Sequence, residues 1–444
     1  MPRSHLYIIL LALLAYALTS GVTLRDRLLI ATLHRIEREA LFEPSTKELF
    51  EGAMTGMANV LYDHYGDQNT TYIPPVEQAK YLDDMDNRFE GLGFSWNTHK
   101  EEGKRKLFVL HPIQHAPAYR AGLRSGDQIL QINGVPIENQ PHSELSSLLT
   151  QRQEIHMSVL PFGQKEAQDF LIRRERISMD SVVGDHFYSG KRVFHLETHP
   201  QIGYIRITLF SPTTAIEFRN ALDSMMESGV EAFILDLRDN FGGDMSNSIQ
   251  VAQMLMSPAD TGDVIVTVRP RSGFEHHRRL ITGMQRVTLP MVVLIDGETA
   301  SASELLAAAL QDHGRATIVG TRSFGKGSIQ NIAVLPFQSG MLQLTFSEYR
   351  RPSGAGIQRR PNAAEEDEWG VVPDNIVEFS PTERSAVTQF RSLRANVIAA
   401  ERLAVLEHFR QQIIEVRSDG FEFTGNAPYF DAQLDEAIRI LTTR

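Results

Sequence analysis

The sequence predicts an α/β protein with a separate β-rich unit and flanking helices. From residue 202 onward, continuous apolar strands such as Ala232–Leu237 and Met291–Ile295 alternate with amphipathic helices. That pattern is typical of a sheet covered on both faces. Residues 89–177 instead carry short strands separated by glycine turns. Helical periodicity dominates residues 24–65 and recurs beyond residue 381.

Length and composition narrow the class of protein. At roughly 100–200 residues per domain, 444 residues predict two to four domains. The net charge of −11 argues against sequence-independent nucleic-acid binding, which needs a basic surface. The absence of cysteine excludes disulfide scaffolds, thiol nucleophiles and thiolate metal sites. With 42% hydrophobic and 22% charged residues, the composition is that of a globular protein.

The first element, residues 1–22, predicts export. Leu6–Leu18 is an unbroken apolar run, followed closely by positive charge. This length suits the hydrophobic part of a signal peptide, and Ala15 to Ala17 supply a cleavage pattern. An uncleaved membrane anchor in residues 6–22 is the alternative, because counting on to Val22 approaches the length of a span. Either way, we expect the rest of the chain in the periplasm or cell envelope.

Residues 23–86 form the predicted N-terminal helical region. Apolar residues recur at helical spacing between Leu24 and Tyr65 in two runs. Ser45 and Glu48 form an S-x-x-E capping box at the start of the second helix. Residues 67–75 are polar and proline-rich, which predicts a loop.

Residues 88–178 form the predicted β-rich unit. A short helix ends at Gly122, and a helix over His142–Leu149 buries one leucine face. Strands over Ile155–Leu160 and Asp169–Arg174 close the unit. Its length of about 90 residues is that of a small domain.

Residues 179–380 form the predicted α/β core, and residues 381–444 a C-terminal helical region. The predicted strands are Tyr204–Leu209, Ala232–Leu237, Val264–Val268, Met291–Ile295, Ala316–Val319 and the more exposed Met341–Tyr349. The predicted helices are Thr213–Ser228, Ser246–Met256, Ser303–Gln311, Thr382–Arg417 and Ala432–Leu441. The acidic segment over residues 359–368 predicts a loop. We find no internal repeat.

The segment Asp296–Glu304 is the first candidate for chemistry, because it follows a buried strand and precedes a helix. Ser301 and Glu304 form a second capping box, so Ser301 is explained as a helix cap. The same position puts a serine beside unpaired backbone N–H groups that can stabilise an oxyanion. The two interpretations are compatible.

The second candidate is Lys326, which lies between two glycines in Phe324–Gln330. Glycines let a backbone pack closely and aim the amine inward. A lysine activates a serine only when neutral, which requires desolvation, and Phe324 and Ile329 could supply it. On an extended chain, Ser328 and Gln330 share the face of Lys326. A solvated lysine in a glycine turn is the alternative.

Other motifs point to weaker candidates. Gly320–Lys326 matches the G-x-x-x-x-G-K part of a phosphate-binding loop, but Gly327 replaces the expected hydroxyl and a strand-like segment follows. His195, Glu197 and His199 would share one face of a strand, without a further ligand to complete a metal site. We therefore predict neither a metal nor a cofactor. Asp236–Gly243 is a turn after a buried strand that could bring a glycine N–H near the serine.

Taken together, the segments around Ser301, Lys326 and Asp236–Gly243 resemble the carboxy-terminal processing proteases, also called tail-specific proteases. The order and spacing of the motifs agree with that family, including 25 residues from Ser301 to Lys326. The resemblance runs from about Leu24 to the end of the chain. It implies a crotonase-like α/β core with an inserted PDZ domain and flanking helices.

The resemblance also implies the roles of individual residues. Ser301 is the expected nucleophile, Lys326 the general base, and Gln330 the residue that orients the lysine. The expected oxyanion donors are the N–H groups of Ala302 and of either Gly242 or Gly243. The family's turn usually has proline where this chain has Phe241.

The activity implied is that of an exported serine endopeptidase that cuts proteins near apolar C-terminal tails. A PDZ domain adds a peptide strand to a sheet edge and holds its carboxylate on a backbone loop. The matching loop is Gly91, Leu92, Gly93 and Phe94. The competing hypotheses are a catalytically silent PDZ adaptor and, more weakly, a nucleotide-binding protein. Residues 359–369 look like an acidic insertion relative to the family, and both its role and the oligomeric state stay open.

Overall fold

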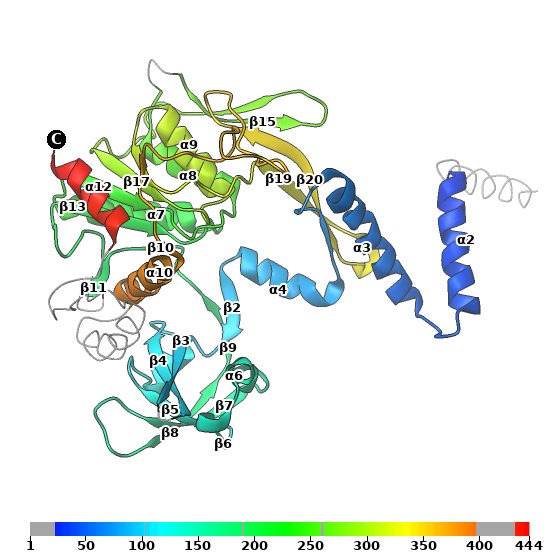
Figure 1. Cartoon of the computed structure of the whole chain (residues 1–444), viewed down its shortest axis with the longest axis horizontal. Helices are drawn as coiled ribbons and strands as arrows, with labels where there is room; N and C mark the ends of the chain where they lie inside the picture. The colour runs from blue at the N-terminus through cyan, green and yellow to red at the C-terminus, as the bar shows by residue number, and fades with distance from the viewer. Residues whose placement is uncertain (1–22, 102, 189–190, 259–261, 397–430, 444) are drawn as a thin grey trace, which may run out of the picture. The chain divides into compact units, whose positions relative to one another are not determined.

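The fold is described by a computed structural model (Figure 1) that covers all residues except 1–22, 102, 189–190, 259–261, 397–430 and 444. The chain divides into two compact units, residues 1–78 with 330–345, and residues 79–329 with 346–444. The predicted signal or anchor lies outside the described residues, as does the predicted helix 382–417 beyond Asn396. No helix in the described ranges is both long and apolar enough to cross a membrane.

The first unit contains the two predicted helices, α2 (Leu24–Glu39) and α3 (Thr46–Tyr65). The predicted capping box of Ser45 and Glu48 is confirmed. Residues 67–75 are not all loop, however. Thr71–Ile73 form strand β1, which pairs antiparallel with the first residues of β20 (Met341–Arg350). Three residues are too few to show an alternating pattern in the sequence.

The β-rich unit begins after α4 (Pro75–Met85). Its sheet has the order β3-β4-β5-β7-β8, so β3 is an edge strand. These strands are β3 (Phe94–Glu101), β4 (Lys104–Pro112), β5 (Gln128–Ile132), β7 (Glu154–Leu160) and β8 (Gln168–Arg173). The smaller elements are β2 (Arg88–Gly91), β6 (Val135–Pro136), β9 (Glu175–Ser178), α5 (Pro117–Ala121) and α6 (His142–Thr150). Leu107, Ile132, Leu145 and Met157 are fully buried in its core.

The α/β core is a six-stranded sheet of order β10-β13-β14-β17-β18-β21, in which β13 to β21 run parallel. Its strands are β10 (Val182–Val183), β13 (Ile202–Ile207), β14 (Ala232–Asp236), β17 (Met291–Ile295), β18 (Thr317–Gly320) and β21 (Asn375–Ile376). Every residue of β14 and β17 is buried, which explains their unbroken apolar sequences.

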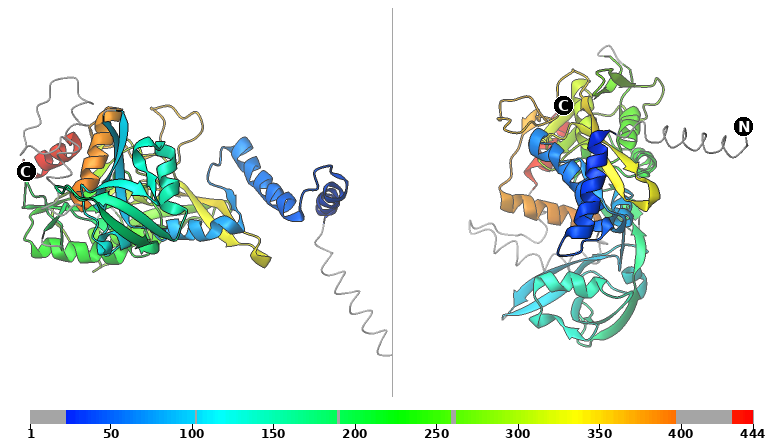
Figure 2. Two further views of the ribbon diagram at one scale, coloured as in Figure 1. Left: turned by 90° about the horizontal axis from the view of Figure 1, so that it is seen from below. Right: turned by 90° about the vertical axis from the view of Figure 1, so that its right-hand side faces the viewer.

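Helices cover both faces of this sheet, as the alternation of strands and helices predicts. Val293 packs in the cluster that includes α7 (Thr214–Glu227), α8 (Met245–Leu255) and α9 (Ala302–Asp312). The neighbouring residues Val292 and Leu294 point the other way, against α12 (Ala432–Thr442). Figure 2 shows α12 (red) and α10 (Pro381–Asn396, orange) on the side of the sheet away from α7.

The remaining strands border the core. They are β11 (His186–Tyr188), β12 (Lys191–Val193), β15 (Val264–Pro270), β16 (His276–Arg279) and β19 (Ser328–Val334). The acidic segment 359–368 contains neither helix nor strand, as predicted. The segments that follow β14, β17 and β18 are the three candidate stretches of the sequence. They meet at the carboxyl edge of the parallel sheet, where such folds place their sites.

Candidate active site

Ser301 lies directly before α9 in a strained backbone conformation. Its φ of +56° is in a region that residues other than glycine rarely adopt. The loop is held by the Ala300 N–H, which donates to the Asn240 carbonyl at 2.9 Å. The predicted cap contact is present, since the Ser301 N–H donates to Glu304 Oε2 at 2.8 Å. Strain that is fixed by surrounding contacts is typical of functional positions.

The loop around Lys326 requires both of its glycines. A Cβ on Gly325, whose φ is +89°, would lie 2.7 Å from the Arg359 side chain, and one on Gly327 would lie 2.5 Å from the Gln358 nitrogen. The predicted close packing is therefore confirmed. Phe324 is 51% exposed, and desolvation of the lysine by Phe324 and Ile329 stays a prediction. The ring of Trp369 also lies close to this loop, since a Cβ on Gly325 would be 2.9 Å from it.

Trp369 anchors the acidic loop against the lysine loop. Its ring is 6% exposed and lies between the guanidinium groups of Arg322 and Arg359, whose carbons are 3.7 and 4.4 Å from the ring centroid. Arg322 also donates to the carbonyls of Glu365 and Trp369. Cation–π contacts of this kind stabilise partly buried aromatic rings. The acidic segment is thus an ordered part of the site's surroundings.

The buried carboxylate of Glu304 connects the serine loop with the lysine loop. Glu304 Oε2 accepts the Ser301 N–H and the Lys326 N–H, both at 2.8 Å. Its Oε1 accepts the Gly325 N–H and the Ser323 hydroxyl, both at 2.6 Å. Burial raises the pKa of Glu304 to about 7, although the four hydrogen bonds act in the opposite direction. The sequence identified Glu304 only as a helix cap, since its other partners lie about 20 residues away.

Tyr349 on β20 makes a second connection between the same two loops. Its hydroxyl is 2.7 Å from the Ser301 carbonyl and also contacts the Lys326 carbonyl. Its N–H donates to the Gly327 carbonyl at 2.8 Å. Burial raises the pKa of Tyr349 well above its usual value, so the hydroxyl keeps the proton that it donates. No local motif marked this residue.

The third candidate segment, Asp236–Gly243, begins with buried charges. Asp236 pairs with Arg238 at 2.7 Å and with Arg391 at 3.2 Å, and Arg238 reaches Asp431 at 2.8 Å. Burial acts to raise the pKa of Asp236, but the guanidinium groups of Arg238 and Arg391 outweigh it and hold the pKa well below its usual value. The strand end is therefore a fixed ionic network.

The glycine turn that follows lies against the serine. A Cβ on Gly242 would be 2.7 Å from the Ser301 Cβ. The Gly242 N–H donates to Asn240 Oδ1 at 2.9 Å, so it is already engaged. Among the residues that the structure describes, the N–H groups of Gly243 and Ala302 have no hydrogen-bond partner. Gly243 is exposed, whereas Ala302 is only 2% exposed.

Gln330 lies in the first unit, where its Nε2 donates to Thr345 Oγ1 at 3.1 Å. Its contact with Lys326 stays a prediction. The backbones of Ser301 and Lys326 are brought together by Glu304 and Tyr349. A hydrogen bond between Ser301 Oγ and Lys326 Nζ also stays a prediction.

The predicted peptide-binding loop is tightly packed. Gly93 has a φ of +78°, and a Cβ there would lie 2.2 Å from the Ala116 Cβ. The carbonyls of Leu92 and Gly93 accept N–H groups of Ala118 and Ile113, both at 2.8 Å. Within the described ranges, the N–H groups of Leu92 and Gly93 have no partner. Phe94 begins the edge strand β3.

The phosphate-loop hypothesis is wrong, because strand β19 follows Lys326 and the motif requires a helix there. The strand expected to carry His195 and His199 is absent as well. His195 makes one isolated bridge, and a turn in which the Ile202 N–H donates to the His199 carbonyl ends the extended segment.

Glu197 instead joins Asp185 and His186 in a cluster whose ligand-type atoms lie within 4.8 Å of one another. Arg394 supplies one positive charge beside the two carboxylates of this cluster. Its guanidinium lies 2.7 Å from Asp185 and 3.7 Å from Glu197.

Comparison with known proteins places this geometry in a family. Residues 201–377 match the sequence model of peptidase family S41, and residues 82–160 match that of the PDZ domain. The chain is 32% identical over 313 residues to the carboxyl-terminal-processing protease of Synechocystis sp., covering 70% of this chain and 67% of that protein. The chain belongs to peptidase family S41.

Other relatives of this S41 chain agree. The carboxy-terminal processing protease CtpB of Bacillus subtilis is 30% identical over 328 residues, which cover 73% of this chain and 64% of the relative. A solved S41 protease from Bacteroides fragilis shares the fold, with a TM-score of 0.52 and 15% identity over 86% of this chain and 96% of that one. The predicted fold class, an α/β peptidase core that carries a PDZ domain, is confirmed.

Proposed function

We propose that this chain is a serine endopeptidase in which Ser301 attacks the scissile carbonyl and Lys326 is the general base. The observation that carries the proposal is the Glu304 carboxylate, which accepts the backbone N–H of both residues. A Ser–Lys mechanism needs nucleophile and base within hydrogen-bond reach. We assign Gln330 to orient the lysine amine. No metal or other cofactor is required.

We assign the oxyanion hole to the N–H groups of Ala302 and Gly243. Donors that point at the developing negative charge stabilise the tetrahedral intermediate of acyl transfer. The start of α9 favours an anion as well, through its unpaired N–H groups. The bond from the Gly242 N–H to Asn240 supports Gly243 over Gly242 as the second donor.

We assign recognition of apolar C-terminal tails to the PDZ domain. The free N–H groups of Leu92 and Gly93 suit a terminal carboxylate, and the edge strand β3 can accept a peptide strand. Gly91 and Phe94 flank this loop. The substrates we propose are exported or membrane proteins of the periplasm or cell envelope, where residues 1–22 would deliver the enzyme as a signal peptide or anchor.

A catalytically silent PDZ adaptor is the competing hypothesis. The strained φ of Ser301 and the two glycines that flank Lys326 argue against it, because a binding module needs none of these features.

The test compares Ser301→Ala, Lys326→Ala and Ser303→Ala on a fluorogenic peptide with an apolar free C-terminus. We expect the first two variants to lose cleavage, and their double variant to be no worse than either. Ser303→Ala is a matched control, since this buried hydroxyl has no partner in the described part of the chain and alanine replaces it without loss. Wild-type cleavage by Ser301→Ala would refute the mechanism. A fully folded wild type that binds but never cleaves such peptides would favour the adaptor.

A further inference from the structure

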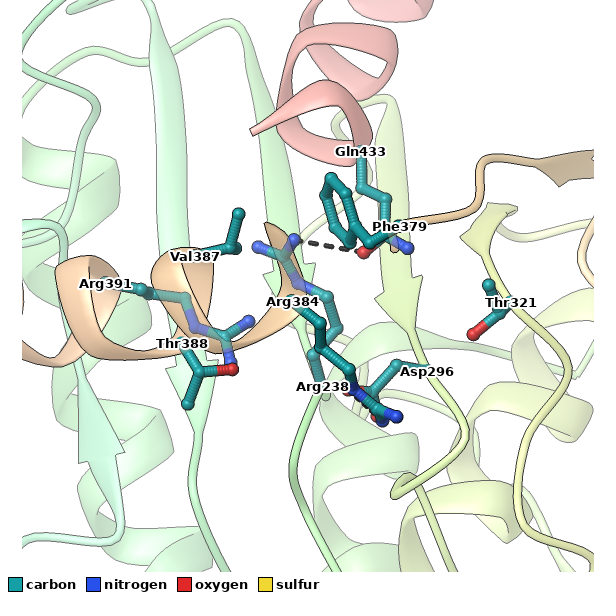
Figure 3. Close-up of a pocket in the computed structure, with 9 residues that line it drawn as sticks. All are labelled: Arg238, Asp296, Thr321, Phe379, Arg384, Val387, Thr388, Arg391 and Gln433. Atoms are coloured by element: carbon teal, nitrogen blue, oxygen red, sulfur yellow. Dashed lines mark hydrogen bonds and ion pairs between the residues drawn. The ribbon is translucent and has the colours of Figure 1, made fainter. Parts of the chain in front are cut away.

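Helix α10 sends three arginines to three different carboxylate sites. Arg384 reaches Asp296 at 3.1 Å, and Arg391 reaches both Asp236 and Asp239. The third, Arg394, pairs with Asp185, which belongs to none of the three catalytic segments. Figure 3 shows Arg384 and Arg391 extending from α10 toward Arg238 and Asp296.

Asp239 is the first residue of the glycine turn and has an unfavourable backbone conformation, with a φ of +57°. Its carboxylate accepts from Arg391 and from Thr388 Oγ1, both on α10. Its N–H donates to Asp296 Oδ1 at 3.1 Å. Helix α10 therefore holds the side chain of Asp239, and Asp296 in the serine loop holds its backbone N–H.

Asp296 and Asn240 continue this chain of contacts to the serine. Asp296 Oδ1 accepts the N–H groups of Asp239 and Thr299, while its Oδ2 pairs with Arg384. Asn240 accepts the Ala300 N–H on its carbonyl and the Gly242 N–H on its side chain. Asp239 and Asp296, whose contacts fix the oxyanion turn, are thus each paired with an arginine of α10.

We propose that Arg384 and Arg391 are positioning residues that hold the turn over residues 239–243 opposite Ser301, so that α10 controls the oxyanion hole. This inference rests on the proposed peptidase function. Without these cations Asp239 and Asp296 lose the guanidinium groups that pair with them, whereas Asp236 keeps Arg238 at 2.7 Å, and the turn would leave its strained conformation. Because oxyanion donors act on the negative charge that develops in the transition state, we expect the effect on kcat.

The experiment measures kcat and KM for Arg384→Ala, Arg391→Lys and the matched control Arg394→Ala, together with circular dichroism and thermal unfolding. We expect kcat to fall about tenfold or more in the first two variants, with KM changed less than about twofold, since lost transition-state contacts appear in kcat. Arg394→Ala should keep wild-type kcat. Folded Arg384→Ala and Arg391→Lys proteins with unchanged kcat, or a loss confined to KM, would overturn the inference.

Chemical rescue distinguishes positioning from a general loss of structure. A cavity of about 90 Å³ adjoins Arg384 and Arg391, so guanidinium ion can reach the position that a truncated side chain vacates. Millimolar guanidinium should raise the kcat of Arg384→Ala and leave wild type and Arg394→Ala unchanged. If it raises none of them while Arg384→Ala stays folded and slow, the positioning role is wrong.

Labelling with a fluorophosphonate separates failure of this inference from failure of the proposed function. Wild type should be labelled at Ser301, and Ser301→Ala should not be. An unlabelled, inactive wild type would contradict the peptidase proposal, whereas a labelled wild type whose arginine variants keep full kcat would contradict only the role of α10.

Discussion

The Glu304 carboxylate accepts the Ser301 backbone N–H at 2.8 Å and is fully buried. A helix cap of this kind is normally a local contact at the protein surface. Here the same oxygen also holds the Lys326 N–H, so one residue supports both halves of the proposed dyad.

At pH 8, where most Glu304 carboxyl groups are ionised, Glu304→Gln should reduce kcat/KM at least about tenfold. The amide presents an N–H₂ group where the carboxylate accepts two donors, and each lost bond to a charged acceptor is worth roughly 1.5–3 kcal/mol. Peptide cleavage assays measure the loss. Glu366→Gln, an exposed change in the acidic loop, is the control and should retain activity. Equal activity of the two variants would contradict the role of Glu304.

The raised pKa of Glu304 predicts a pH dependence of stability. Its pKa is about 7 in the folded protein against 4.5 as the usual value, so the folded state binds the proton more tightly. This contribution to the free energy of unfolding is fully present below about pH 4.5 and is lost as the pH rises through 7.

Urea unfolding at pH 5 and pH 8 measures this dependence. The free energy of unfolding of wild type, relative to that of Glu304→Gln, should be higher at pH 5 than at pH 8 by about 1 kcal/mol or more. A difference that is the same at both pH values would exclude the raised pKa.

Tyr349→Phe should lower kcat about tenfold and the free energy of unfolding by about 1 kcal/mol, because it removes the hydroxyl between the Ser301 and Lys326 carbonyls. Steady-state kinetics and urea unfolding report the two effects. Tyr188→Phe is a matched control, since that side chain is 68% exposed. If the two variants behave alike, the bridge has no part in activity.

A peptide with a free apolar C-terminus should be cleaved faster than its C-terminal amide. The Leu92 and Gly93 N–H groups would bind a carboxylate, and the amide removes the negative charge. Competition between the two peptides at equal concentration gives the ratio of kcat/KM. Equal cleavage of both would rule out carboxylate recognition by this loop.

The sequence predicted the features that depend on neighbouring residues. Apolar runs identified β14 and β17 because both strands are buried on both faces. Glycines beside Lys326 identified a closely packed loop, and the spacing of Ser301 and Lys326 indicated the family.

Contacts between residues far apart in the sequence leave no local pattern. Tyr349, Arg384 and Arg391 act through partners 23 to 155 residues away, and nothing in their local sequence distinguishes them from other polar residues. The two-residue strand β10 and the three-residue strand β1 were missed because they are too short to show a period. Glu304 was recognised for its cap and not for its tertiary bonds.

The enclosure of Trp369 between two arginines gives the protein an internal optical reporter. The chain has only two tryptophans, Trp369 beside the lysine loop and Trp96 on the edge strand of the PDZ domain. Trp96→Phe leaves an emission spectrum that comes from the lysine loop alone. Its wavelength and intensity would follow ordering of that loop in real time, during folding or inhibitor binding, without an attached dye.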